Sequence, residues 1–130
     1  MGRKSKNWCG RFLHWGDVKL QYFAKNGVKL AIKHINAAGG VPGKELEVVS
    51  QDDACDSAKA TLVAAEMIEE KVIKVIGHIC NNSTEAALPS HASANIPVIS
   101  AASTNPNLTD DGKYPNFFRT ISHDASQAHL

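Results

Sequence analysis

With 130 residues, 43% of them apolar, this chain is long enough to bury the core of one modest domain. Its 14 basic and 13 acidic side chains give a net charge of +1 and are interspersed apart from a basic start at residues 3–6, which argues against nucleic acid as a partner. No apolar run approaches the length of a membrane span, and we identify no export signal because polar residues interrupt residues 8–15.

Helix and strand patterns alternate along the chain. No convincing strand is predicted in residues 1–16. Apolar spacing predicts a helix over residues 17–38, which Gly39 and Gly40 end. We expect further helices over residues 57–71, with Asp56 as N-cap, and 83–95, and strands over residues 46–50, 74–77, 96–99 and 117–120. This order predicts an α/β fold in which a parallel sheet is flanked by helices in three layers.

The stretch 74–84 is the centre of the functional prediction. Its apolar run ends at Gly77, and Asn82 with Glu85 forms a capping-box pattern that predicts the start of a helix. Open α/β sheets bind ligands beyond the carboxyl ends of their strands, and the free N–H groups of a helix start favour an anion such as a carboxylate. The alternative is an ordinary capped turn that binds no ligand.

Three strand ends are expected to converge on one edge of the sheet, at residues 51–55, 77–84 and 100–104. The second and third are rich in hydroxyl and amide groups. None supplies a Ser–His–Asp arrangement or a pair of carboxylates positioned by spacing, and the glycine patterns of nucleotide sites are absent. The residues therefore give no support for catalysis or for a bound cofactor.

His78, Cys80 and His91 are residue types that can take part in metal or thiol chemistry. The His-x-Cys spacing differs from that of common zinc sites, so no metal is predicted. Nothing beside Cys80 would lower its pKa as a nucleophile requires. If Cys55 and Cys80 lie at the ends of neighbouring parallel strands, their Cβ atoms could come within disulfide range. Such a bond would imply an oxidising compartment, which conflicts with the missing export signal.

Several motifs in the same order resemble the bacterial periplasmic leucine/isoleucine/valine-binding proteins. The resemblance covers roughly residues 15–130 and implies the incomplete first lobe of a type I periplasmic binding protein. Members of that family have two α/β lobes that close over an amino acid, have no catalytic activity and deliver the amino acid to a membrane ABC permease. The matching motifs are 36–44 (NAAGGVPGK), 52–56 (DDACD), 75–80 (VIGHIC) with Ser83-Thr84, 100–109 (SAASTNPNLT) and 118–120 (FRT).

The resemblance also implies which positions bind leucine, isoleucine or valine. An aromatic residue of the family packs on the ligand side chain, and a serine usually binds the carboxylate where Asn81 stands here. The loop 102–104 would offer a carbonyl and a threonine hydroxyl to the ammonium and carboxylate. Cys55 and Cys80 match the disulfide of the family, and His78 has a counterpart that needs no metal. The implied ligand-binding residues are Trp15, Ile79, Cys80, Asn81, Ala102, Ser103 and Thr104.

Two departures from the family pattern bear on function. Residues 1–14 do not resemble the first strand and loop of the family, which would leave a central edge of the sheet unpaired. By comparison with the family, we also expect the second lobe, with the acidic residue that completes the ammonium site, to be missing. We therefore predict an altered N-terminus over residues 1–14 and a partial amino-acid-binding lobe over residues 15–130, periplasmic by resemblance. The alternatives are an enzyme, a sensor or a regulatory domain on a similar sheet, and a nonfunctional fragment.

Overall fold

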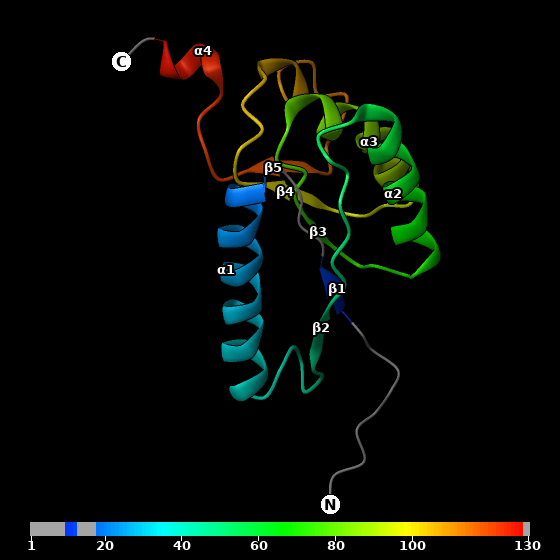
Figure 1. The fold of residues 1–130 in the computed structure, drawn as a ribbon, viewed down its shortest axis with the longest axis vertical. Helices are drawn as coiled ribbons and strands as arrows, with labels where there is room; N and C mark the ends of the chain where they lie inside the picture. The colour runs from blue at the N-terminus through cyan, green and yellow to red at the C-terminus, as the bar shows by residue number, and fades with distance from the viewer. Residues whose placement is uncertain (1–9, 13–17, 129–130) are drawn as a thin grey trace, which may run out of the picture.

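The computed structural model of the chain describes residues 10–12 and 18–128. Its helices and strands alternate as predicted (Figure 1). In chain order they are β1 (Gly10–Phe12), α1 (Val18–Ala37), β2 (Leu46–Val48), α2 (Ser57–Glu69), β3 (Val75–Ile76), α3 (Asn81–Ser93), β4 (Val98–Ser100), the 3-10 helix η1 (Pro106–Leu108), β5 (Phe117–Arg119) and α4 (Asp124–Gln127).

All of these strands run parallel, in two hydrogen-bonded groups. One group pairs β1 with β2, and the other has the order β3-β4-β5. Helix α1 stands on one side of the strands while α2 and α3 cover the other (Figure 1). The predicted three layers, a parallel sheet flanked by helices, are therefore confirmed.

A strand opens the domain, so the prediction of no strand in residues 1–16 is wrong. Gly10 pairs with Leu46 and Phe12 with Val48, and β1 also contacts β3. The expected unpaired edge beside β2 is therefore occupied by the N-terminal residues. Three residues beginning with glycine carry no alternation of apolar and polar side chains, so pairing with β2, rather than local propensity, defines this strand.

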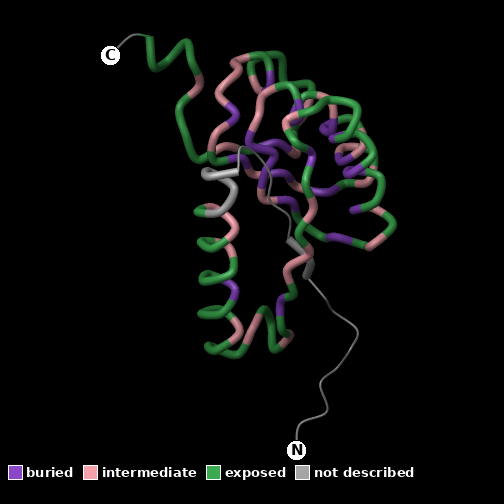
Figure 2. The backbone as a smooth tube through the Cα atoms, viewed as in Figure 1, coloured by how far each residue is buried: buried purple, intermediate pink, exposed green. Residues whose placement is uncertain are grey.

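The main core lies between α2, α3 and the strands β3, β4 and β5 (Figure 2). On α2 the buried side chains recur every three or four residues, which places them on one helix face. Alanines at 60, 64 and 87 form a second buried cluster between α2 and α3, and such small side chains let two helices approach closely. Leu62 is 65% exposed, because it lies on the side of α2 away from these buried residues.

Helix α1 is covered much less than its apolar pattern predicts. Ile32 is buried, whereas Leu30 is 55% exposed and Ile35 is 37% exposed. Gly39 and Gly40 both have positive φ and end the helix, as expected. A Cβ at Gly40 would lie 1.9 Å from the Lys44 carbonyl oxygen, so the turn after α1 requires glycine at this position.

The two predicted helix caps have different outcomes. The Asp56 side chain accepts a hydrogen bond of 2.7 Å from the Lys59 N–H and caps α2, as predicted. The predicted cap at Asn82 is wrong, because α3 begins at Asn81 and has Cys80 as its N-cap, without a capping side chain. The Asn82 amide instead donates to the Cys55 carbonyl at 2.7 Å.

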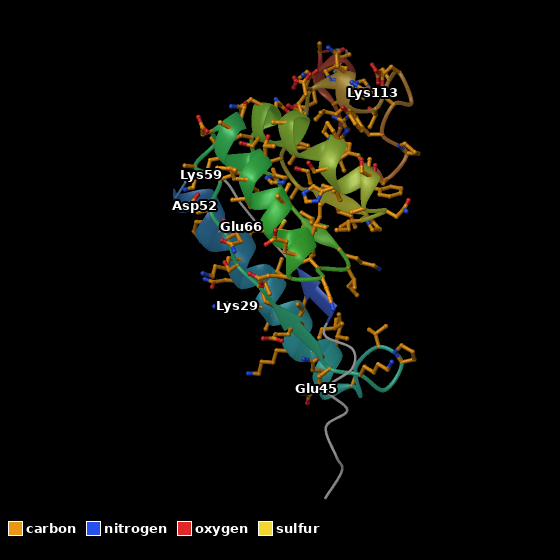
Figure 3. All side chains as sticks on the ribbon, turned by 90° about the vertical axis from the view of Figure 1, so that its right-hand side faces the viewer. Lys29, Glu45, Asp52, Lys59, Glu66 and Lys113 are labelled. Carbon is orange, nitrogen blue, oxygen red and sulfur yellow. A yellow bond between two sulfur atoms is a disulfide. The ribbon has the colours of Figure 1, made fainter. Side chains whose placement is uncertain are left out.

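The outer surface of these layers is charged. Lys29 on α1, Lys59 and Glu66 on α2, and Glu45 before β2 are exposed and carry their charges on the outside of the layers (Figure 3). Within the described part of the chain, none of the helices combines the length and the apolar character needed to span a bilayer.

Candidate functional site

A disulfide joins the loops that follow β2 and β3. It links Cys55 to Cys80, whose Cα atoms are 5.5 Å apart, as the family resemblance implied. The two cysteines do not lie on neighbouring strands, because β2 pairs with β1 and β3 pairs with β4. They meet instead through the loops beyond the strand ends, where Asn82 also bonds the Cys55 carbonyl.

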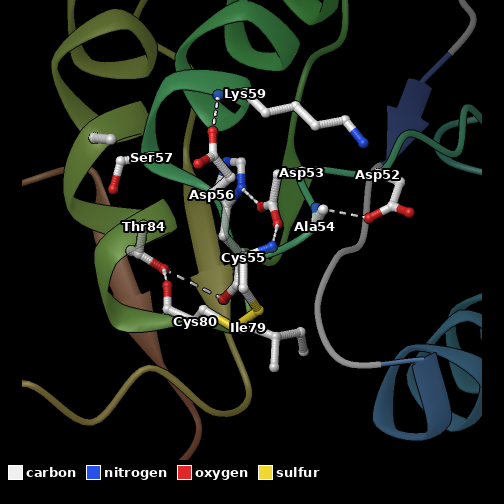
Figure 4. A network of polar contacts seen from close by, with 12 residues as sticks. Asp52, Asp53, Ala54, Cys55, Asp56, Ser57, Lys59, Ile79, Cys80 and Thr84 are labelled. Carbon is white, nitrogen blue, oxygen red and sulfur yellow. Dashed lines mark hydrogen bonds and ion pairs between the residues drawn. A yellow bond between two sulfur atoms is a disulfide. The ribbon is translucent and has the colours of Figure 1, made fainter.

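The acidic cluster after β2 shapes this loop. Asp52 accepts a hydrogen bond of 2.7 Å from the Ala54 N–H, and Asp53 accepts one of 2.8 Å from the Cys55 N–H (Figure 4). Ala54 and Cys55 have φ of 50° and 56°, in the left-handed region that L-residues seldom adopt. These carboxylates therefore stabilise the turn that presents Cys55 to Cys80.

The loop after β4 is fastened to the end of β3 through hydroxyl groups. Ser103 Oγ donates to the His78 carbonyl at 3.0 Å and lies 2.6 Å from Thr84 Oγ1. Ser100 Oγ also donates to the His78 carbonyl, at 2.5 Å. Ser100, Ser103 and Thr84 are fully buried, so the hydrogen bonds of these hydroxyls are made to other protein atoms.

Arg119 of β5 supports the same loop from the other side. Its guanidinium donates to the Ser103 carbonyl at 3.2 Å, to the Asn105 carbonyl at 3.1 Å and to Thr109 Oγ1 at 2.6 Å. The planar group therefore connects three positions between Ser103 and Thr109 in the segment that follows β4. This role of Arg119 was not predicted from the sequence, and its only signal there is an arginine within the FRT motif on a short strand.

The structure brings together two of the segments implied to bind ligand, residues 79–81 and 102–104. Ser103 Oγ is 3.3 Å from the Ile79 carbonyl, and the Asn105 N–H donates to Asn81 Oδ1 at 3.0 Å. Ile79 is buried, whereas Cys80, Asn81, Ala102 and Thr104 are half-buried. Trp15, the remaining implied ligand residue, lies outside the described residues.

The start of α3 provides hydrogen-bond donors at this edge. The first intrahelical bond runs from the Thr84 N–H to the Cys80 carbonyl, at 2.9 Å. No described residue accepts a hydrogen bond from the N–H groups of Asn81, Asn82 or Ser83. These groups and the positive end of the helix dipole favour an anion. Among the described residues, none bonds the Ala102 carbonyl or the Thr104 hydroxyl.

Beneath this edge lies a chain of buried titratable side chains. His78 Nδ1 is 2.5 Å from Asp53 Oδ2, and His78 Nε2 is 3.3 Å from His91 Nε2. Burial alone would raise the pKa of Asp53, but hydrogen bonds from His78 and from the Cys55 N–H hold that pKa below its ordinary value. Burial, and then the charge of His78, lower the pKa of His91 to about 3.

His78, Cys80 and His91 do not form a group of metal ligands. Across residues 10–12 and 18–128, no three histidine, cysteine, aspartate or glutamate side chains are grouped so that they could hold an ion. His78 and His91 instead contact each other, and Cys80 is in a disulfide. The donors at this edge suit an organic carboxylate rather than a cation.

Comparison with known proteins identifies the family. The sequence model of the receptor family ligand binding region matches residues 23–130. The chain belongs to this family. It is 41% identical over 118 residues to the leucine-specific-binding protein of Salmonella typhimurium, an alignment that covers 91% of this chain and 30% of the relative.

Solved structures agree with this assignment. A substrate-binding protein of an ABC transporter from Desulfitobacterium hafniense, in complex with Leu, matches with a TM-score of 0.81 and 32% identity over 90% of this chain and 35% of that one. A branched-chain amino acid transporter substrate-binding protein from Streptococcus pneumoniae, in complex with isoleucine, matches with a TM-score of 0.80 and 30% identity over 90% of this chain and 34% of that one.

The type I periplasmic binding protein fold and the resemblance to leucine/isoleucine/valine-binding proteins are thereby confirmed. The chain spans about 30% of the length of the curated relatives that it matches. The relatives are binding proteins by name, in agreement with the lack of a catalytic arrangement among the motifs of this sequence.

Proposed function

We propose that this chain forms one wall of a binding site for leucine, isoleucine or valine in a substrate-binding protein of an ABC transporter. The observation that carries the proposal is the meeting of residues 79–81 with residues 102–104 beside the start of α3. This meeting occurs in a chain that is 41% identical to a leucine-specific-binding protein.

Each proposed ligand residue has a chemical role at this edge. The α3 N–H groups and the Asn81 amide bind the carboxylate of the amino acid, since all of them can donate hydrogen bonds. The Ala102 carbonyl accepts from the ammonium, and the Thr104 hydroxyl bonds either charged group. Ile79 and the Cys80 side of the disulfide form an apolar surface for the aliphatic side chain. The family resemblance implies that Trp15 packs on the same aliphatic side chain.

Ser103 has a different role from the other proposed ligand residues. Its hydroxyl is fully buried and bonds the carbonyls of His78 and Ile79. It therefore acts on the ligand indirectly, because it holds the loop that carries Ala102 and Thr104.

The proposed partners and compartment follow from the proposed role as a substrate-binding protein. The amino acid would be passed to a membrane ABC permease, and no reaction would be catalysed. A disulfide between Cys55 and Cys80 supports an oxidising compartment such as the periplasm.

A ligand-sensing domain is the second candidate function. The observation that favours it is the description of the matching family as a receptor ligand-binding region. Such a sensor could use the same site without transport. Genes for a permease and an ATPase beside the gene for this chain would support transport, whereas an adjacent signalling gene would support sensing.

A titration followed by nuclear magnetic resonance tests the proposed site. Adding leucine at concentrations well above one millimolar, so that a weak site fills, should shift the amide signals of residues 79–83 and 102–104, while those of α2 stay unchanged. Leucinamide, which lacks the carboxylate, should produce much smaller shifts, because the donors at the start of α3 lose their partner. Shifts that are absent, or that are equal for the two compounds, would contradict the proposal.

A further inference from the structure

His78 lies at the junction of the structures that build the proposed site. Its ring is fully buried and contacts two other buried side chains, Asp53 from the loop after β2 and His91 from α3. Its backbone follows β3 directly and leads into residues 79–81. A single residue therefore contacts the loop after β2, helix α3 and the wall of the proposed site.

The carbonyl of His78 makes an equally dense set of contacts. It accepts hydrogen bonds from Ser100 Oγ at 2.5 Å, Ser103 Oγ at 3.0 Å and Thr84 Oγ1 at 3.4 Å. Ser100 and Ser103 belong to β4 and the loop after it, which continues into residues 102–104. One segment of the proposed site therefore follows the His78 peptide group in the chain, and the other is hydrogen-bonded to its carbonyl.

The proton on His78 is assigned by its partner. An ionised carboxylate only accepts hydrogen bonds, and the pKa of Asp53 is held below its ordinary value, so His78 Nδ1 must carry the hydrogen. The two Nε2 atoms, 3.3 Å apart, share one hydrogen. The ring is therefore held at both nitrogens, and the backbone of His78 is fixed by its own side chain.

We propose that His78 is a positioning residue, whose Nδ1–H bond to Asp53 fixes the spacing between segments 79–81 and 102–104. The ligand part of this inference rests on the proposed function, whereas the spacing itself does not. Segment 79–81 follows His78 in the chain, and segment 102–104 is tied to its carbonyl. Loss of the Asp53 bond would free both segments without removing any atom that touches ligand.

Two substitutions at His78 distinguish the proposed hydrogen bond to Asp53 from a purely steric role of the buried ring. The amide nitrogen of an asparagine takes the place of Nδ1, so His78→Asn keeps a donor for Asp53. His78→Leu has a similar bulk and no donor. Met67→Ala is the matched control, because Met67 is fully buried in the main core and its truncation lowers global stability while the hydrogen-bond partners of His78 are all retained.

Amide hydrogen exchange of the whole chain, without ligand, is the first measurement. In His78→Leu the exchange rates of residues 79–81 and 102–104 should rise about tenfold to a hundredfold more than those of α2, as expected for the loss of one charge-assisted bond. His78→Asn should restore most of that protection. Met67→Ala should raise exchange broadly. Equal changes in both segments and α2, or no rescue by asparagine, would overturn the proposal.

Leucine affinity of the same variants is the second measurement, read from the nuclear magnetic resonance titration. If leucine binds the native chain, His78→Leu should weaken it about tenfold or more and His78→Asn by much less, whereas an unchanged affinity in His78→Leu would overturn the positioning role at the site. If leucine does not bind the native chain while the exchange pattern holds, the proposed function fails and the fixed spacing stands.

Discussion

Buried polar residues at the ligand-side edge divide into two groups. In the first group, the side chains of Asp53, Ser100 and Ser103 are fully buried and form hydrogen bonds to other protein atoms. In the second group, Asn81 and Thr104 are only half-buried. A buried polar group without a partner costs about 1–3 kcal/mol, which explains why the first group is fully bonded. His91 departs from this rule, because its Nδ1 is buried and no described residue bonds it.

The pKa of His91 predicts a pH-dependent stability. It is lowered from its ordinary value of 6.5 to about 3 by burial and by the charge of His78. Between these pH values the unfolded chain binds a proton that the folded chain does not. The contribution of His91 to the free energy of unfolding is therefore complete above pH 6.5. As the pH decreases below this value, the contribution falls by up to about 1.4 kcal/mol per pH unit. Urea unfolding at a series of pH values measures the slope.

Two variants isolate the contribution of His91. His91→Gln keeps an amide near the Nε2 position and cannot be protonated, so its stability should depend less on pH between 6.5 and 4. His34→Gln, at an exposed position of α1, is the control and should keep the native slope. An unchanged slope in His91→Gln would contradict the assignment of the pH dependence to this histidine.

Residue-scale predictions from the sequence held where the contact is local. Asp56 caps α2 through an N–H three residues away, and that pattern is visible in the sequence. The cap at Asn82 failed because its amide binds the Cys55 carbonyl, 27 positions earlier in the chain. The contacts of Asp53, His78 and His91 were missed for the same reason, since no spacing rule connects them.

At the scale of elements, Asn36 connects α1 to β2. Its Nδ2 donates to the Leu46 carbonyl at 2.9 Å, and its Oδ1 accepts from the Leu46 N–H at 2.8 Å. The side chain thus pairs with a strand as a backbone amide would. This connection gives a structural role to the asparagine that begins the motif at residues 36–44.

Asn36→Ala should therefore destabilise the fold by about 1–3 kcal/mol, because it leaves both polar groups of Leu46 without their partners. Asn36→Asp should cost at least as much, since a second acceptor would face the Leu46 carbonyl. Chemical denaturation measures both. Asn26→Ala, at an exposed position of the same helix, is the control and should be neutral or slightly stabilising. A loss below 0.5 kcal/mol in Asn36→Ala, on the order of a surface substitution, would contradict this role.

Helices were predicted better than strands, and the reason is their length. The first helix was expected over residues 17–38 and occupies Val18–Ala37, because its repeat extends over several turns. The strands have two or three residues each, too few to show a period. The parallel direction of the strands was predicted from the alternation of helices and strands, whereas the place of β1 was not, since it depends on pairing with β2.

At the scale of the whole molecule, an apolar groove of about 380 Å³ lies beside α1, although the end of that helix contacts β2. Helix α1 contributes most of its lining, including Val28, Ile32 and Ile35, and Ile76 and Ala101 lie opposite. The sequence pattern predicted an apolar face on α1 but not how well it is covered. Incomplete burial of that face reduces the hydrophobic stabilisation that α1 contributes.

The last prediction concerns how tightly this chain binds a branched-chain amino acid. A free amino acid carries two charges, and both must be bonded when it leaves water. The described edge offers donors for the carboxylate, but the motifs place no acidic side chain for the ammonium. Absence of that partner costs about 1.5–3 kcal/mol, and incomplete enclosure of a leucine side chain costs about 1.5–3 kcal/mol more.

Together these losses correspond to roughly two to four orders of magnitude in affinity. We therefore expect this chain to bind leucine no more tightly than about millimolar, as measured by calorimetry or by the resonance titration. Thr104→Val, which keeps the shape of the side chain and removes its hydroxyl, should weaken this binding further, while Thr61→Val on the exposed face of α2 should not. Micromolar binding by the native chain would mean that the described edge, together with residues outside the described ranges, already satisfies both charges of the ligand.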